Sequence, residues 1–128
     1  MQIAIDGTAA SGKGTLSNLL SNALNLPRLD TGLIYRKVAF TYINYIKLIP
    51  ETDVIDNSVL KKILNNFDLN DLDPETLNDD IYGNFASIIG KYDFVRSKLK
   101  IIQIEFVEKM TEKKGGCILD GRDIGTKI

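Results

Sequence analysis

The sequence contains no histidine and only one cysteine among its 128 residues. The missing imidazole excludes Ser-His-Asp and Cys-His nucleophiles, HExxH zinc sites and a histidine general base. Cys117 has no second cysteine with which to form a disulfide in this chain, and it lies in an apolar run that favours a buried thiol. We therefore expect chemistry that needs no imidazole, in a reducing cytoplasm.

The chain also lacks a large net charge and a long apolar run. Sixteen basic residues nearly cancel 17 acidic ones, so the formal charge of −1 gives no general attraction to nucleic acid or membrane. Asp6 interrupts the N-terminal apolar stretch before a signal peptide could form, and no run approaches the length of a membrane span. With 44% hydrophobic residues, the composition predicts one soluble domain whose anion sites are local.

Apolar periodicity predicts alternating strands and helices at the start of the chain. The long C-terminal helix should carry Val95, Leu99, Ile102, Phe106 and Met110 on one face. The predicted elements are a strand over 3–5, a helix over about 16–24, a weak strand over 26–29, helices over about 33–49, 58–67 and 75–89, the long helix ended by Gly115, and a strand over 116–120. A βαβα beginning favours an α/β fold with a parallel sheet, and we expect no strong strand over 50–92.

A GxxxxGK pattern lies between the first predicted strand and the first predicted helix. In that context small residues let backbone N–H groups turn toward phosphate oxygens, the helix start adds its positive dipole end, and a lysine supplies a mobile cation. The pattern therefore predicts a site for the phosphates of ATP, formed by Gly7, Thr8, Ala9, Ala10, Ser11, Gly12, Lys13, Gly14 and Thr15.

The position after Lys13 departs from the general phosphate-loop pattern. A serine or threonine that binds magnesium is usual there, whereas this chain has Gly14 and places the hydroxyl one residue later at Thr15. The GKGT ending resembles nucleoside monophosphate kinases, in which Mg²⁺ is held mainly by substrate phosphates, water and a carboxylate at another strand's end. Asp120 follows the last apolar run and is the candidate carboxylate.

Two further segments match one family. Residues 30–36 read DTGLIYR and resemble the D-[ST]-G-x-x-Y-R segment of bacterial cytidylate kinases, and residues 120–126 read DGRDIGT and resemble their DGRDxGT segment. Ser87 and Arg96 match further positions, and the segments span essentially the whole chain in family order. The resemblance implies transfer of the γ-phosphoryl group of ATP to CMP or dCMP.

The resemblance also implies a role for each matching residue around CMP. Arginines suit phosphate as planar cationic donors, and the base edge of cytosine calls for both donors and acceptors. By this carry-over Arg36 and Arg122 grip the acceptor phosphate, Ser87, Arg96 and Asp123 surround the base, Thr31 contacts CMP, and the Tyr35 ring lies against the pyrimidine. With Lys13 and Asp120, the two arginines form the expected catalytic set.

In fold terms the resemblance implies a P-loop NTPase-type three-layer α/β/α domain. Residues 1–128 match the N-terminal half of the family fold, with 50–92 as a reduced, mostly helical insert that binds the acceptor nucleotide. The family continues with further strands and a lid that carries arginines. We therefore expect residues 1–128 alone to have little activity and to self-associate or need the other half of the fold, and expect the full-length enzyme to be monomeric.

Two alternatives stay open from the residues alone. One is a P-loop kinase for another small acceptor such as shikimate or gluconate, which the DTGxxYR and DGRDxGT segments disfavour. The other is a catalytically incompetent nucleotide-binding fragment of a cytidylate kinase. A GTPase is disfavoured because the chain has no NKxD-type guanine reader.

Overall fold

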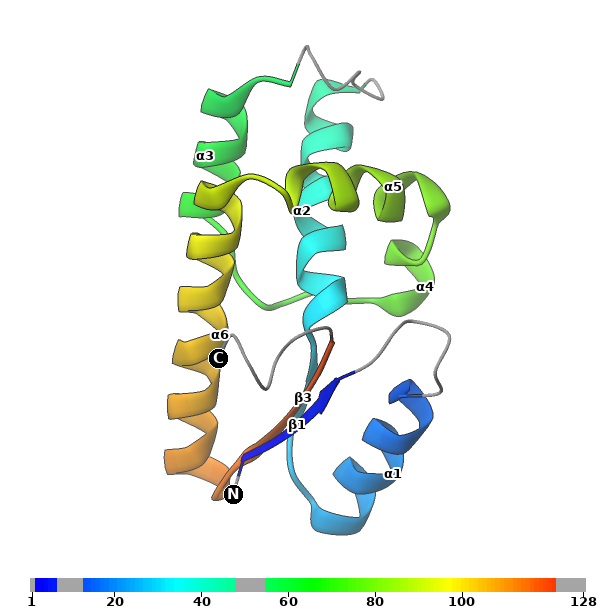
Figure 1. The fold of residues 1–128 in the computed structure, drawn as a ribbon, viewed down its shortest axis with the longest axis vertical. Helices are drawn as coiled ribbons and strands as arrows, with labels where there is room; N and C mark the ends of the chain where they lie inside the picture. Colours follow the sequence, from blue (N-terminus) through cyan, green and yellow to red (C-terminus); the bar gives the residue numbers. More distant parts are fainter. Residues whose placement is uncertain (1, 7–12, 48–54, 122–128) are drawn as a thin grey trace. The chain divides into compact units, whose positions relative to one another are not determined.

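The computed structural model describes residues 2–6, 13–47 and 55–121 of the chain (Figure 1). Its elements in chain order are β1 (Gln2–Asp6), α1 (Lys13–Leu24), β2 (Arg28–Asp30), α2 (Thr31–Ile46), α3 (Asn57–Asn65), α4 (Pro74–Leu77), α5 (Asp80–Ile89), α6 (Asp93–Lys114) and β3 (Cys117–Gly121). None of the helices within these ranges is long and apolar enough to cross a bilayer.

The chain divides into two compact units. The sheet unit combines residues 1–32 with residues 100–128, and the helical unit consists of residues 33–99. The helical unit is wider at both ends than the insert expected over 50–92. That insert stays a prediction, and each unit is described by itself.

The sheet unit contains a three-stranded parallel sheet in the order β1-β3-β2. Ile3 pairs with Ile118 on one side of the central strand, and Leu29 pairs with Leu119 on the other. The sheet lies between α1 and the second half of α6 (Figure 1). Leu26 and Ile118 are buried together, and Leu20 of α1 packs against them. The predicted α/β class with a parallel sheet is confirmed.

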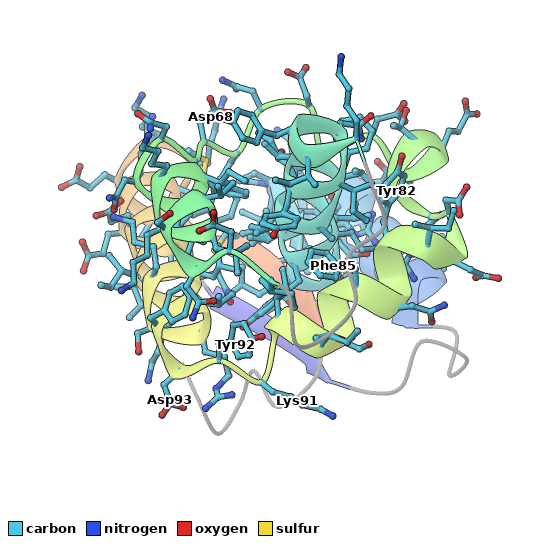
Figure 2. The ribbon with its side chains drawn as sticks, turned by 90° about the horizontal axis from the view of Figure 1, so that it is seen from above. Asp68, Tyr82, Phe85, Lys91, Tyr92 and Asp93 are labelled. Carbon is cyan, nitrogen blue, oxygen red and sulfur yellow. The ribbon has the colours of Figure 1, made fainter. Side chains whose placement is uncertain are left out.

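The helical unit has its own apolar core. The rings of Tyr42 and Phe85 lie 5.2 Å apart, and the Tyr42 hydroxyl accepts a hydrogen bond of 2.8 Å from the backbone N–H of Asp56 (Phe85 is labelled in Figure 2). The other fully or almost fully buried apolar side chains are Ile34, Val38, Ala39, Leu60, Leu64, Leu77, Ile89, Val95 and Leu99. Between residues 55 and 92 the only regular elements are the helices α3, α4 and α5, and no strand occurs in that range, as expected.

Carboxylate caps explain why the stretch after residue 55 is rich in aspartate. Asp56, Asp73 and Asp79 each accept a backbone N–H at the start of a helix, namely α3, α4 and α5. The prediction of one helix over 75–89 is therefore wrong. Its apolar spacing continues, but Asp79 accepts from the backbone N–H of Ile81 at 2.9 Å and begins a new helix there.

Smaller differences concern helix and strand boundaries. The second strand begins at Arg28 rather than at residue 26, and α2 begins at Thr31. In the second half of α6 the most buried side chains are Gln103 and Val107, whereas the expected Ile102, Phe106 and Met110 are only partly buried.

The end of the long helix is as predicted. Gly115 follows α6 with a φ of 81°, a left-handed conformation that favours glycine. Cys117 is buried in β3, also as predicted.

Candidate functional site

The expected phosphate loop connects the elements that such a loop requires. β1 ends at Asp6 and α1 begins at Lys13, so the chain passes from a parallel strand to the start of a 12-residue helix. Residues 7–12 lie outside the described part of the chain, and Lys13, Gly14 and Thr15 form the first residues of α1. A helix start of this kind presents backbone amides and a positive dipole end to an anion.

Asp120 lies near the carboxyl end of the central strand, as predicted. It pairs in register with Ile5 of β1 on one side and Asp30 of β2 on the other. The Asp120 side chain is fully buried. Three strand ends therefore meet around this carboxylate, at the edge where parallel sheets bind ligands.

Arg28 of β2 supplies a cation to the buried carboxylate, and sequence reasoning missed it. Its Nε donates to Asp120 Oδ2 at 2.9 Å, and its Nη2 lies 2.8 Å from the same oxygen. The same Nη2 lies 4.0 Å from Asp30 Oδ2. Because alternate residues of a strand share a face, Arg28 and Asp30 point the same way, which was the available signal. The register with β3 was not available from the sequence.

Thr31 ties the start of α2 to the same strand end. Its hydroxyl donates to the backbone carbonyl of Asp120 at 2.9 Å, and its side chain is buried. This bond holds β2 and β3 together where the sheet ends. The expected contact between Thr31 and CMP stays a prediction.

Few carboxylates lie together near the described strand ends, which suits a metal that is held mainly by phosphate oxygens. Within the described ranges, no group of three or more His, Cys, Asp or Glu side chains could hold a metal ion. Mg²⁺ needs only one or two protein carboxylates when phosphates and water complete its shell. That Asp120 supplies this carboxylate stays a prediction: its side chain is buried, and its Oδ2 accepts from Arg28.

Arg36 lies on α2 in the helical unit and is held by neutral groups. Its Nη1 donates to the carbonyl of Leu77 at 2.8 Å and to that of Asp79 at 3.2 Å. The guanidinium also lies against Gly83 of α5, where a Cβ would be 2.6 Å from Nη2. Neutral partners leave the positive charge of Arg36 for an anion.

Tyr35 and Arg96 lie close together in the helical unit. Burial raises the pKa of the Tyr35 hydroxyl, and the positive charge of Arg96 opposes that shift. The Tyr35 ring would be 3.6 Å from a Cβ at Gly90, so it lies against the end of α5. Arg96 Nη1 donates to the Gly90 carbonyl at 3.0 Å, and Nη2 contacts the carboxylate of Asp93, which points outward in Figure 2.

Ser87 lies on α5, one turn after Gly83. Its hydroxyl donates to the Gly83 carbonyl at 3.1 Å. The structure thus gathers the helical unit's expected acceptor residues along α2, α5 and the start of α6. Arg122 and Asp123 lie outside the described residues.

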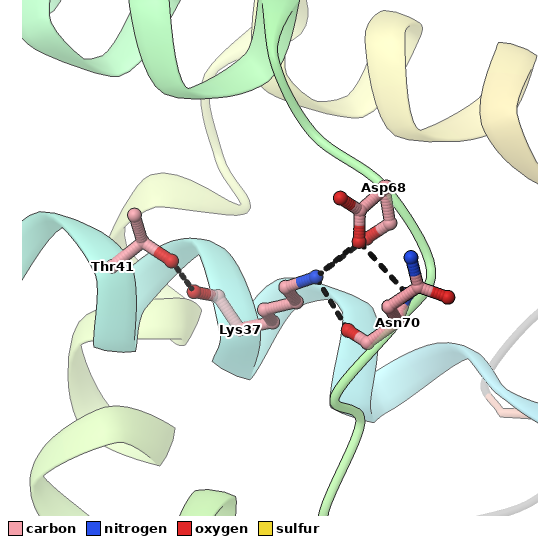
Figure 3. Close-up of polar contacts among 4 residues, drawn as sticks. All are labelled: Lys37, Thr41, Asp68 and Asn70. Carbon is pink, nitrogen blue, oxygen red and sulfur yellow. Dashed lines mark hydrogen bonds and ion pairs between the residues drawn. The ribbon is translucent and has the colours of Figure 1, made fainter.

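Lys37 of α2 contacts the segment that follows α3, and the sequence did not indicate this contact (Figure 3). Its Nζ lies 2.9 Å from Asp68 Oδ1, 2.7 Å from the Asp68 carbonyl and 2.5 Å from the Asn70 carbonyl. The ammonium also lies 5.0 Å from the centre of the Phe67 ring. The hydrogen bond from Lys37 is the main reason that the pKa of Asp68 is lowered. Lys37 therefore orders the chain between α3 and α4, next to Arg36 in sequence.

Comparison with known proteins agrees with these features. A family model described as cytidylate kinase matches residues 3–128. A cytidylate kinase of Xanthobacter autotrophicus is 40% identical over all 128 residues, and one of Azorhizobium caulinodans is 39% identical. One of Rhodospirillum rubrum is 38% identical, again over the whole of this chain.

The chain spans only part of these relatives. It covers 57% of the length of the first two proteins and 58% of the third. The family model, by contrast, matches nearly every residue of this chain, including the strand end at Asp120 and the helices that carry Arg36 and Arg96. The chain belongs to the cytidylate kinase family.

Proposed function

We propose that this chain binds ATP and CMP or dCMP as part of an enzyme that transfers the γ-phosphoryl group to the acceptor, giving ADP and CDP or dCDP. The observation that carries the proposal is the arrangement around Arg36. A guanidinium held by two neutral carbonyls, at 2.8 and 3.2 Å, keeps its charge for an anion. The curated relatives named cytidylate kinase supply the reaction type.

On the donor side, Lys13 and the amides of the loop before it would hold the β- and γ-phosphates of ATP. Asp120 would hold Mg²⁺ through water, and the metal supplies charge neutralisation on the phosphates. Arg28 keeps the Asp120 carboxylate in one orientation through two contacts below 3 Å. Thr31 fixes the backbone at the same residue.

On the acceptor side, Arg36 and Arg122 would align the CMP phosphate with the γ-phosphate of ATP. The attacking atom is a phosphate oxygen that is already largely ionised near neutral pH, so no general base is required. Alignment and charge stabilisation supply the rate enhancement. The absence of histidine is compatible with this mechanism.

Selection of the base would rest on Ser87, Arg96 and Asp123, with the Tyr35 ring against the pyrimidine. Arginine and serine hydrogens suit N3 and O2 of cytosine, and a carboxylate accepts from the N4 amine. Uracil has a carbonyl at that position, which leaves Asp123 without its partner. A role in cytoplasmic pyrimidine nucleotide metabolism is part of the proposal.

The test is a titration of this chain with CMP and UMP. We expect CMP to bind more tightly, because an unsatisfied hydrogen-bonding group in a base site costs about 1–3 kcal/mol. Asp123→Asn should narrow the difference, whereas Asp71→Asn, at an exposed site, should leave it unchanged. Equal affinities of the unaltered chain for CMP and UMP would overturn CMP as the acceptor.

A further inference from the structure

Gly83 lies inside α5, where glycine is the costly choice. The helix runs from Asp80 to Ile89, and a glycine in a helix interior costs about 1 kcal/mol relative to alanine. Among the described glycines, the left-handed φ values belong to Gly115 and Gly116, so the backbone of Gly83 does not require a missing side chain. Space, not backbone conformation, explains this residue.

The space at Gly83 is occupied by the Arg36 guanidinium. A Cβ at this position would lie 2.6 Å from Nη2, 2.9 Å from Cζ and 3.2 Å from Nη1. Cβ contacts below 3.0 Å are essentially never tolerated, so one of the two groups would have to move. These three atoms are the far end of a flexible side chain, so the guanidinium is the group that would be displaced.

Displacement of the guanidinium would also break the hydrogen bonds that orient Arg36. Nη1 donates to the carbonyls of Leu77 and Asp79, which lie on either side of Asn78 at the junction of α4 and α5. Nη2 is the nitrogen closest to Gly83. The glycine and the two carbonyls together hold the guanidinium in one place.

We propose that Gly83 is a positioning residue for the acceptor phosphate. Its missing side chain seats the Arg36 guanidinium against α5, in the orientation set by the carbonyls of Leu77 and Asp79. This inference rests on the proposed function, in which Arg36 binds the phosphate of CMP. Ser87, one turn further along the same helix, would receive the base end of the same nucleotide.

The experiment compares Gly83→Ala with Asn84→Ala, an exposed neighbour on the same helix that should gain similar helix propensity. Each chain is titrated with CMP and with cytidine, which lacks the phosphate, and its melting temperature is measured. For Gly83→Ala we expect CMP affinity to fall about 10-fold to 100-fold, the range for lost charged hydrogen bonds. Cytidine affinity and the melting temperature should not fall.

A second comparison uses Arg36→Ala as the background. If Gly83 acts through Arg36, adding Gly83→Ala to Arg36→Ala should produce no further loss of CMP affinity. Gly83→Ser places a Cβ at the same point and should behave like Gly83→Ala. These results together would support the positioning role.

Opposite outcomes separate this inference from the function beneath it. If the unaltered chain binds CMP and Arg36→Ala weakens that binding, an unchanged CMP affinity in Gly83→Ala overturns the positioning role alone. An equal loss of CMP and cytidine affinity would also overturn it, because that result indicates a general disturbance of the helix. If the unaltered chain does not bind CMP, the proposed function fails and this inference fails with it.

Discussion

The sheet unit and the helical unit differ in which parts of the chain they bring together. The sheet unit pairs Ile3 with Ile118, from opposite ends of the sequence, through a parallel ladder. The helical unit is one continuous stretch, residues 33–99, in which Arg36 of α2 contacts Leu77 and Asp79. Parallel pairing between segments that are distant in sequence forms more slowly during folding than contacts between segments that are close in sequence. The proposed donor site therefore depends on pairing between segments from opposite ends of the chain, and the proposed acceptor site on helix packing within one continuous stretch.

The two units also use arginine differently. Arg28 in the sheet unit lies beside the buried carboxylate of Asp120, so its charge is compensated within the protein. Arg36 in the helical unit is held by backbone carbonyls. A cation paired with a carboxylate supports the fold, whereas a cation held by neutral oxygens is available to a phosphate. We therefore expect a structural role for Arg28 and a binding role for Arg36.

The largest expected effect comes from cutting the core of the helical unit. Leu60→Ala removes a fully buried side chain and should lower the free energy of unfolding by about 2–5 kcal/mol. If the units unfold separately, hydrogen exchange should quicken across 55–99 but not in β3. Asn65→Ala, an exposed change on the same helix, is the control. Equal loss of protection in both units would break the comparison.

The second largest expected effect is on nucleotide binding, and it should distinguish the proposed ATP site from the proposed CMP site. Lys13→Ala should weaken ATP binding about 10-fold to 100-fold, because a charged donor to phosphate is lost, and should leave CMP affinity unchanged. Titration with each nucleotide, together with a melting curve, measures both. Lys109→Ala makes the same charge change at an exposed position of α6. The phosphate-loop assignment is wrong if Lys13→Ala and Lys109→Ala bind ATP equally well.

Arg28→Met sharpens the contrast between the two arginines. Breaking a buried ion pair costs about 3–5 kcal/mol, and because the Arg28 side chain is 24% exposed we expect about 1–2 kcal/mol. Denaturant unfolding measures the loss, and Arg28→Lys should recover part of it. Unchanged stability in Arg28→Met would show that the Asp120 carboxylate does not need this partner.

The smallest effect concerns the contact between Lys37 and Asp68. Since the folded pKa of Asp68 is lowered, the contact is favourable above the ordinary aspartate pKa of about 4 and is lost as the pH falls through the lowered pKa. Lys37→Met should raise the Asp68 pKa toward its ordinary value, as followed by the carboxyl carbon signal in NMR. Lys91→Met, in the exposed turn labelled in Figure 2, should leave it unchanged. Identical titration in all three chains would contradict the contact.

Much of the fold could be predicted because its signals are local. Alternation of apolar runs with helical spacing predicted β1, α1, α6 and β3, and glycine after Lys114 predicted the end of the long helix. Boundaries were less accurate where a capping side chain competes with apolar spacing. The break between α4 and α5 depends on which aspartate accepts a backbone N–H, and several aspartates in that stretch could do so.

For the candidate site, the sequence by itself determined the residue types at each motif position, including Lys13, Arg36 and Asp120, because their chemistry follows from the side chain and its place relative to a strand or helix end. Only the tertiary structure decided what holds them. The pairing of Arg28 with Asp120 needs the register of β2 on β3, and the seat of Arg36 on Gly83 needs the packing of α2 on α5. Both join residues far apart in the sequence, and no local pattern encodes a contact that exists only after the chain has folded.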